Sequence, residues 1–495
     1  MTRTVRDVAV IDVGSNSVRL VLYRVDGRAI WTTYNEKVLA GLGRGLARSG
    51  RLSPEGVEQA LAALRRFAAV TGARPELEVL TAATAAVRDA EDGPAFVARV
   101  REATGLSLRV LSGEEEARFS ALGVAAGQAD ADGVVGDLGG SSLEFVRLAG
   151  REPGAGVTLP LGPLALGSGS KAAFDEARLR REVARRLEPA AAAYRTDRFY
   201  AVGGAWRNIA LLHMAASGWP LRIVHQYEIF AADALETARL VARQSKGALE
   251  RIEGVSKKRA ETLPYAALVL EGLVERLGVR RVAFCAYGLR EGLIFDRMDE
   301  ETRAADPLVE GCASLGGRQG LARELGPALE RWLAPLWTSR ERAFGRVRST
   351  TLLAAAARLA DLGAGFHPDH RGRLAFEQVL RAPVAGQSHA ERAYLAQAVY
   401  SRYAGAGTPE DALLSRVIDP ETVAEARALG AALRLGCDLS GRSPELLERA
   451  ALSAVDGVLS LTAGDDASDL LQGEQTHKRL AALAEALELE CHLAG

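Results

Sequence analysis

Cysteine is scarce in this sequence of 495 residues and occurs only at positions 285, 312, 437 and 491. No two cysteines have the Cys-x-x-Cys spacing of a zinc ribbon or a redox motif, so we expect neither, and a reducing environment fits them best. Long hydrophobic runs are also absent, because no stretch approaches the roughly 18 apolar residues that span a bilayer. The N-terminal apolar run, broken by Asp12, is too short for a signal peptide. We therefore expect a cytoplasmic protein that has no membrane partner.

An excess of one charge is missing as well, since 62 basic residues balance 63 acidic ones. This balance argues against a generally basic DNA-binding protein, although a local basic track remains compatible with it. Lysine is rare and occurs only at positions 37, 171, 246, 257, 258 and 478. A GC-rich genome explains the preference for arginine, and arginine also suits two-point contacts with phosphate. The apolar content of 48% is typical of globular proteins and excludes wholesale disorder.

The first 300 residues alternate segments typical of strands with segments typical of helices. Ser53, followed by Pro54, is expected to cap a helix, and later helices are expected at Pro94–Ala103 and Glu114–Ala126. This alternation predicts an α/β fold with a mixed sheet. The predicted strands are Val8–Ile11, Arg19–Val25, Trp31–Leu39, Leu77–Thr81, Leu106–Leu111, Val134–Leu138, Leu143–Leu148 and Phe199–Val202.

From about Pro307 to the end, alanine and leucine recur at helical spacing and β-branched runs disappear, which predicts a separate all-helical domain. Asp299–Pro307 is the expected joint, and the polar loop Gly127–Gly133 is the expected boundary within the α/β part. The sequence therefore predicts three domains: an N-terminal subdomain at 1–127, a second subdomain at 128–300 and a C-terminal domain at 307–495.

Two loops repeat the same residue types. Asp12–Ser17 reads Asp-Val-Gly-Ser-Asn-Ser and Asp137–Ser142 reads Asp-Leu-Gly-Gly-Ser-Ser, with Asp, Gly and Ser at matching offsets. Each loop lies between two strand-like segments, so each is expected at the tip of a β-hairpin. Ordinary glycine turns, with Asp and Ser as turn formers, would explain one such loop. Two matched copies favour a functional pair.

Glycine lets the backbone turn tightly and approach an anion closely, and successive N–H groups with nearby hydroxyls can surround phosphate oxygens. An aspartate beside such a turn can hold Mg²⁺, which then bridges to phosphate, so Asp12 and Asp137 are the expected metal ligands, together with Glu144. Two facing hairpins of this kind would clamp a polyphosphate. The expected phosphate-binding residues are Gly14, Ser15, Asn16, Ser17, Gly139, Gly140, Ser141 and Ser142.

The repeated hairpin resembles the actin-like ATPase superfamily, and a longer set of motifs narrows this resemblance. Their order over about residues 5–300 is similar to that of the exopolyphosphatase / guanosine pentaphosphate phosphohydrolase family (Ppx/GppA). The resemblance implies two actin-like (ribonuclease H-like) α/β subdomains around a cleft, followed by an all-α HD-like C-terminal domain. The motifs are Asp12–Ser17, Thr84–Arg88, Ser112–Ala117, Asp137–Glu144 and Tyr287–Gly292.

The same resemblance implies a general base within Ser112–Ala117 and places it at Glu116. A carboxylate at the start of a helix, beside Mg²⁺, can align a water behind the terminal phosphorus. The residues alone leave alternatives open, because Glu115 competes for this role. The whole run Glu114–Glu116 can also simply stabilise the positive end of the helix.

Arg88 matches the family's phosphate-binding arginine, which would neutralise charge on the transferred phosphoryl group. An ion pair with Asp89 or Glu91 is its alternative role. Ser141 departs from the family pattern, which usually has a third glycine there, and serine fits only if its φ is not strongly positive. Gly203–Ala205 resembles the position of the nucleoside loop in actin-like proteins, although a glycine pair between strand and helix is common.

The HD-like resemblance does not extend to a metal site, because Leu359–Gly363 lacks the histidine that such a site needs, although His367, His370 and His389 lie nearby. We expect this domain to guide substrate or to form a homodimer. Three basic clusters could guide a polyanion, although such clusters on helices are usually solvated faces. They are Arg178–Arg186, Lys257–Arg259 and Arg340–Arg348.

The leading hypothesis is a Mg²⁺-dependent exopolyphosphatase that removes terminal phosphate from inorganic polyphosphate by attack of a water activated by Glu116. The closest alternative substrate is guanosine pentaphosphate. A non-catalytic sensor of either compound is a second alternative, and an actin-like kinase is a third. The absence of a recognisable sugar-kinase carboxylate motif argues against the kinase. The sequence leaves open the preferred chain length and a requirement for a monovalent cation.

Overall fold

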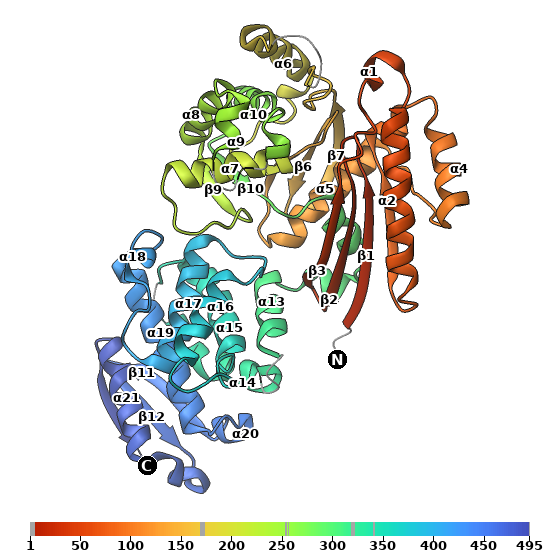
Figure 1. The fold of residues 1–495 in the computed structure, drawn as a ribbon. Coiled ribbons are helices and arrows are strands. Elements are labelled where there is room, and N and C mark those ends of the chain that lie inside the picture. The colour runs from red at the N-terminus through yellow and green to blue at the C-terminus, as the bar shows by residue number, and fades with distance from the viewer. Residues whose placement is uncertain are drawn as a thin grey trace. The chain divides into compact units, whose positions relative to one another are not determined.

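Two mixed β-sheets with their covering helices make up the chain as far as Ala304, and a mainly helical unit, Ala305–Gly495, follows (Figure 1). The computed structural model describes residues 5–168, 174–252, 255, 257–317, 322–339 and 342–494. The prediction of two α/β subdomains with mixed sheets is confirmed.

The first sheet contains β3 (Ala29–Val38), β2 (Val18–Asp26), β1 (Val5–Val13) and β4 (Glu78–Ala83), in that order. β1 runs antiparallel to β2, to which a tight hairpin joins it, and parallel to β4. The helices α2 (Pro54–Gly72) and α4 (Gly93–Thr104) share one hydrophobic core with alternate residues of β1 and β2, so they cover the outer face. The Ser53 hydroxyl accepts from Gly56 N at 3.2 Å, which confirms the predicted helix cap.

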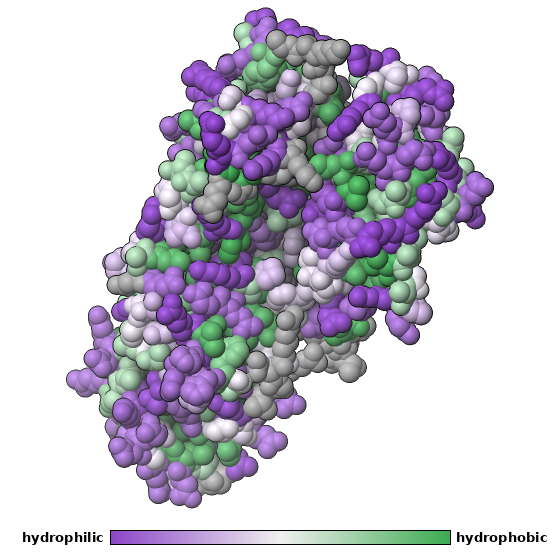
Figure 2. All heavy atoms as spheres, viewed as in Figure 1, coloured by the Kyte–Doolittle hydropathy of each residue, from purple (hydrophilic) through white to green (hydrophobic). Residues whose placement is uncertain are grey.

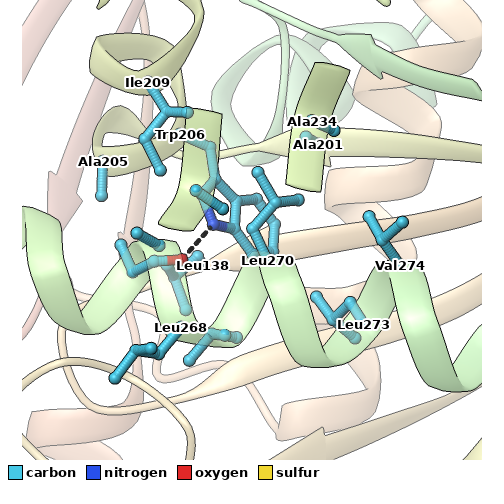
Figure 3. Close-up of a cluster of buried hydrophobic side chains, with 14 of the residues drawn as sticks. Leu138, Ala201, Ala205, Trp206, Ile209, Ala234, Leu268, Leu270, Leu273 and Val274 are labelled. Atoms are coloured by element: carbon cyan, nitrogen blue, oxygen red, sulfur yellow. Dashed lines mark hydrogen bonds between the residues drawn. The ribbon is translucent and has the colours of Figure 1, made fainter. Parts of the chain in front are cut away.

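The second sheet contains β7 (Glu152–Leu159), β6 (Leu143–Ala149), β5 (Gly133–Leu138), β8 (Arg198–Val202), β10 (Arg281–Phe284) and β9 (Tyr227–Phe230), in that order. β5 is antiparallel to β6 and parallel to β8, which repeats the arrangement of β1 with β2 and β4. The outer face of this second sheet packs on α6 (Glu176–Ala191), α7 (Gly204–Ala216), α8 (Ala231–Ala242) and α10 (Leu263–Leu277). In this core the indole N–H of Trp206 donates to Ala266 O at 3.0 Å (Figure 3).

Two helices, α5 (Gly113–Gly127) and α11 (Leu289–Asp296), lie between the inner faces of the two sheets, because one core joins them to both. Their packing is close. A Cβ on Gly292 would lie 1.8 Å from Phe119 O, and one on Gly123 would lie 2.2 Å from Gly288 O. Glycine at these positions therefore lets α11 approach α5, whose first turn lies at the ends of β1 and β5.

The predicted strand Leu106–Leu111 is wrong, since only one bridge, between Ala83 and Val110, forms there. The Thr81 hydroxyl donates to Ser107 O at 2.5 Å and accepts from Arg109 N at 3.2 Å. The Thr81 hydroxyl thus replaces part of the backbone ladder, and the backbone of this segment pairs only with Ala83. The remaining elements of this unit are α1 (Leu46–Ser49), α3 (Ala85–Asp89), α9 (Lys246–Glu250), η1 (Lys257–Arg259) and α12 (Glu300–Ala304).

The unit that begins at Ala305 is mainly helical, as predicted. It also contains a three-stranded sheet, in which β12 pairs antiparallel with β11 and parallel with β13. The helices are α13 (Pro307–Gly316), α14 (Ala322–Thr338), α15 (Gly345–Leu359), α16 (Arg371–Arg381), α17 (His389–Ala404), α18 (Asp411–Leu414), α19 (Pro420–Leu439), α20 (Pro444–Leu447), η3 (Asp465–Leu471) and α21 (Glu474–Ala486), and the strands are β11 (Ala450–Val455), β12 (Val458–Ala463) and β13 (Glu490–Ala494).

The prediction that this unit is all-helical is therefore wrong for its last part. The strands are short and rich in alanine, leucine and serine, so they carry no run of β-branched residues. Their pairing depends on tertiary contacts instead. The indole N–H of Trp332 on α14 donates to Ala450 O at 2.8 Å, and β13 reaches β12 only after α21 intervenes.

On the face seen in Figure 2, hydrophilic residues cover most of the surface of each unit, and hydrophobic residues form small separate patches. Within the described parts of the chain, no helix combines the length and the apolar character needed to cross a membrane.

Candidate active site

The two repeated loops are hairpin tips that close in the same way. Gly14 N donates to Ser17 O and Gly139 N donates to Ser142 O, both at 3.0 Å. The tips face each other, because a Cβ on Gly140 would lie 3.3 Å from Ser15 Cβ. Ser141 has no positive φ, so serine fits at this position without backbone strain.

Four carboxylates gather at the strand ends below these tips. Asp12 and Asp137 lie near the ends of β1 and β5, Glu144 lies directly opposite Asp137 on β6, and Glu116 lies in the first turn of α5. Burial, together with the charges of Asp137 and Asp12, raises the pKa of Glu116 to about 7 against the opposing effect of Arg88. Burial also raises the pKa of Asp137 and of Glu144, and the charge of Glu116 adds to the rise at Glu144.

The structure separates the two candidate bases. Glu115 is part of a capping box, in which its carboxylate accepts from Ser112 N at 2.9 Å, and it pairs with Arg109 at 2.5 Å. These bonds lower its pKa. Glu116 is 8% exposed and lines the pocket between the hairpin tips. Its half-ionised carboxylate suits proton transfer near neutral pH, whereas Glu115 serves the helix end.

Arg88 bonds to the candidate base, since its Nη1 donates to Glu116 Oε2 at 2.9 Å. Its Nε donates to Asp89 Oδ1 at 3.0 Å, so the alternative ion pair with Asp89 also forms. On the other side of the pocket, Arg290 pairs with Asp12 at 2.9 Å. Each arginine thus holds an acidic side chain in a fixed orientation.

Five cationic side chains line the same pocket, and four of them have no carboxylate within ion-pair distance among the described residues. Burial and the neighbouring Arg290 lower the pKa of Arg19 to about 10, and burial and Arg207 do the same for Arg259. Such mutual repulsion is unfavourable unless an anion lies between the charges. The five are Arg19, Lys37, Arg207, Arg259 and Arg290.

The pocket brings together most of the residues that the sequence predicts for a phosphate and metal site. Arg88, Ser141 and Glu144 do not line it, and Arg88 reaches it only through Glu116. The cations were mostly missed as site residues, because they come from five separate elements that only the fold brings together. The predicted residues on the pocket wall are Asp12, Gly14, Ser15, Asn16, Ser17, Glu116, Asp137, Gly139, Gly140 and Ser142.

The carboxylates suit Mg²⁺ by their chemistry, since Mg²⁺ prefers oxygen ligands. Glu144 Oε1 is buried and has no hydrogen-bond partner in the described chain. Burial is the main cause of the raised pKa values of Asp137 and Glu144, and neighbouring carboxylates add to both rises. Among the described residues no three acidic, His or Cys side chains already converge on one point. This fits an ion held by one or two carboxylates and by substrate phosphate.

The predicted basic clusters differ in their surroundings. In the first, Arg185 and Arg186 both pair with Glu182 on the same helix, so these two arginines share one counter-charge. In the second, Arg259 lines the pocket, and the Lys258 side chain lies outside the described residues. In the third, Arg348 pairs with Glu391, and Arg340 is outside the described residues.

Comparisons with known proteins agree on one phosphatase family. The model of the Ppx/GppA phosphatase family matches residues 21–301, which is more than half of the chain, and the model named exopolyphosphatase, C-terminal, matches residues 340–491. The chain is 29% identical over 308 residues to exopolyphosphatase 1 of Mycobacterium tuberculosis and of Mycobacterium bovis, covering 59% of this chain and 89% of theirs.

Solved structures have the same fold over the first unit. A Ppx/GppA family member from Aquifex aeolicus gives a TM-score of 0.52 at 22% identity, covering 59% of this chain and 97% of that one. An exopolyphosphatase from Cytophaga hutchinsonii gives a TM-score of 0.55 at 20% identity, covering 59% and 98%. These likenesses support the actin-like architecture predicted from the motifs.

Proposed function

Because the chain belongs to the Ppx/GppA phosphatase family and is a phosphoanhydride hydrolase, we propose that its substrate is inorganic polyphosphate. It would remove the terminal phosphate with a water activated by Glu116, in a Mg²⁺-dependent reaction. The relatives named exopolyphosphatase support this substrate.

One observation carries the proposal: a single pocket contains two glycine–serine hairpin tips and four cations without carboxylate partners among the described residues. Backbone N–H groups and hydroxyls of the tips can hold the oxygens of one phosphoryl group. These cations come from four elements around the pocket, so they offer contacts to phosphates other than the one between the tips. A chain of phosphates can use several such contacts at once.

In the proposed mechanism the terminal phosphoryl group lies between the hairpin tips, and Glu116 orients a water behind its phosphorus and accepts the water's proton. Arg88 holds the Glu116 carboxylate by the 2.9 Å bond. Mg²⁺, held by one or two of the carboxylates of Asp12, Asp137 and Glu144, would supply positive charge that neutralises the phosphate oxygens. The two glycine-rich turns keep the scissile bond in line with the water.

Phosphate release from long-chain polyphosphate, with Mg²⁺ and with excess chelator, tests the substrate and the metal together. The proposal expects steady release that stops on chelation and resumes when Mg²⁺ is restored. Equal rates with and without Mg²⁺ would contradict the metal assignment. Tight polyphosphate binding with no phosphate release under any metal would favour a non-catalytic sensor.

A second substrate, guanosine pentaphosphate, is favoured by one observation. Gly203 and Gly204, at the position that resembles a nucleoside loop, line the same pocket with Arg259 and Thr262. A Cβ on Gly204 would lie 2.4 Å from Arg259 Nη2, so glycine lets the guanidinium pack flat against the backbone. Parallel assays with both substrates would rank them. A cytoplasmic location and a homodimer stay predictions, and a requirement for a monovalent cation stays open.

A further inference from the structure

The pocket contains a row of charged side chains that crosses three strands. Asp12 on β1 is directly opposite Arg19 on β2, and Arg19 is directly opposite Lys37 on β3. Residues in such register project from the same face of a sheet, and neighbouring strands lie roughly 4.8 Å apart. The row therefore extends about 10 Å from the end of β1 to the edge strand. All three side chains line the pocket.

Lys37 is the last side chain of this row, and four other cations surround it. Arg19 faces it from β2, Arg207 from α7, Arg259 from η1 and Arg290 from α11. Its neighbour Glu36 does not compensate it, because Glu36 pairs with Arg66 at 2.7 Å.

No ion pair to Lys37 forms among the described residues, and an ammonium group gains nothing from four like charges. Lys37 is nevertheless an exposed residue, unlike Glu116, so it marks the mouth of the pocket rather than its floor.

The direction of a bound chain follows from these positions. The scissile end must lie near Glu116, which is buried in the first turn of α5. The rest of the chain must leave through the open side, where the only exposed cation of the five is Lys37. An anionic group at this point would relieve the repulsion among the surrounding guanidinium groups.

We propose that Lys37 binds a phosphoryl group distal to the scissile end and so determines the selectivity of the site for longer phosphate chains. This rests on the proposed function. The edge strand β3 thus adds a substrate contact beyond the two hairpin tips. Lys37 would contribute to binding of the chain and not to cleavage of its terminal bond.

The test compares K37Q, K37R and the control K246Q, which changes an exposed lysine outside the pocket. Steady-state phosphate release is measured with tripolyphosphate and with long-chain polyphosphate. K37Q should raise KM for the long chain about threefold to tenfold, since an exposed charged contact is partly screened, and should leave kcat within about twofold. At pH 6, where Lys37 carries its charge, the rise with tripolyphosphate should be clearly smaller, and K37R and K246Q should behave as wild type.

A pH series adds a readout that a structural role would not move. Burial and the charges of Arg259 and Arg19 lower the pKa of Lys37 to about 7 although part of its side chain stays exposed. Its contact is therefore fully present below about pH 7 and is lost as pH rises. The ratio of wild-type to K37R KM should rise between pH 6 and pH 8.5, and this ratio cancels the ionisation of the substrate itself.

The outcomes distinguish a failure of the proposed role of Lys37 from a failure of the proposed function. Equal effects of K37Q on both chain lengths, or no effect on either, would overturn the role of Lys37 while phosphate release continued. A flat KM ratio across the pH series would also overturn it. No phosphate release from wild-type protein with either substrate would overturn the proposed function, and the role of Lys37 with it.

Discussion

The ionised carboxylate of Glu116 destabilises the folded state, because it is buried. Replacing Glu116 by glutamine should therefore stabilise the metal-free protein, and the gain should depend on pH. The Glu116 carboxyl is 8% exposed, and its pKa rises from an ordinary 4.5 to about 7, mainly because of burial. The folded state thus binds this proton more tightly than the unfolded state does. Stability linked to the proton is complete below about pH 4.5 and is lost as pH rises through about 7.

The magnitude follows from the shift. A change of one pKa unit corresponds to about 1.4 kcal/mol, so ionised Glu116 costs the folded state about 3 kcal/mol above pH 7. Glutamine has nearly the same shape and can still accept the hydrogen bond of Arg88, so E116Q should recover most of this cost. For a unit of this size the gain corresponds to roughly 5 °C in Tm.

The assay is calorimetric unfolding of the full chain at pH 5, 7 and 8.5, with chelator and without phosphate. The Tm difference between E116Q and wild type, taken for the transition of the first unit, should be small at pH 5 and largest at pH 8.5. E115Q is the matched control, because Glu115 holds the capping box and pairs with Arg109. Its loss should lower stability at neutral pH by no more than about 1 kcal/mol.

A Tm difference between E116Q and wild type that is zero or negative at pH 8.5 would refute the reasoning. So would a difference that stays constant across the pH series, because only an ionising group with a raised pKa produces the predicted slope.

The remaining predictions concern the neighbours of Glu116. R88Q removes the cation that opposes the rise in the Glu116 pKa, so the acidic limb of the kcat/KM profile against pH should move up by about one unit; an unmoved limb would contradict the assignment. G292A places a Cβ 1.8 Å from Phe119 O and should lower both Tm and kcat by shifting α11 against α5, at a cost of about 3 kcal/mol or more. G247A, which meets nothing within 4 Å, is the control and should leave both unchanged or slightly raise Tm.

Local features of the fold could be predicted from the sequence because their causes are local. Ser53 caps α2 through a bond three residues away, and each hairpin tip closes through a bond between a glycine and a serine of the same loop. Non-local features were missed. Leu106–Leu111 has strand-like residues, but the Thr81 hydroxyl occupies Ser107 O and Arg109 N, two of the backbone groups that would otherwise pair. The strand β13 pairs with β12 across the whole of α21, and no local pattern marks it.

The residues of the candidate site also fall into two groups: those that the sequence could predict and those that only the fold reveals. Asp12, Asp137 and their turns could be found because the motif repeats. Arg19 and Arg207 could not be distinguished from the many other arginines, and Arg259 was noted only as part of a basic cluster, because only the folded chain brings β2, α7 and η1 to one pocket. The separation of Glu116 from Glu115 also needed the structure, since the capping bonds of Glu115 decide it.

The most direct test of the account is turnover of long-chain polyphosphate by E116Q and E115Q, measured beside equilibrium binding of the same polymer. The account predicts that E116Q loses about 100-fold or more in kcat and keeps its affinity for the polymer, while E115Q stays near wild type. Near-normal turnover by E116Q, or a larger loss in E115Q, would contradict the claim that Glu116 activates the attacking water.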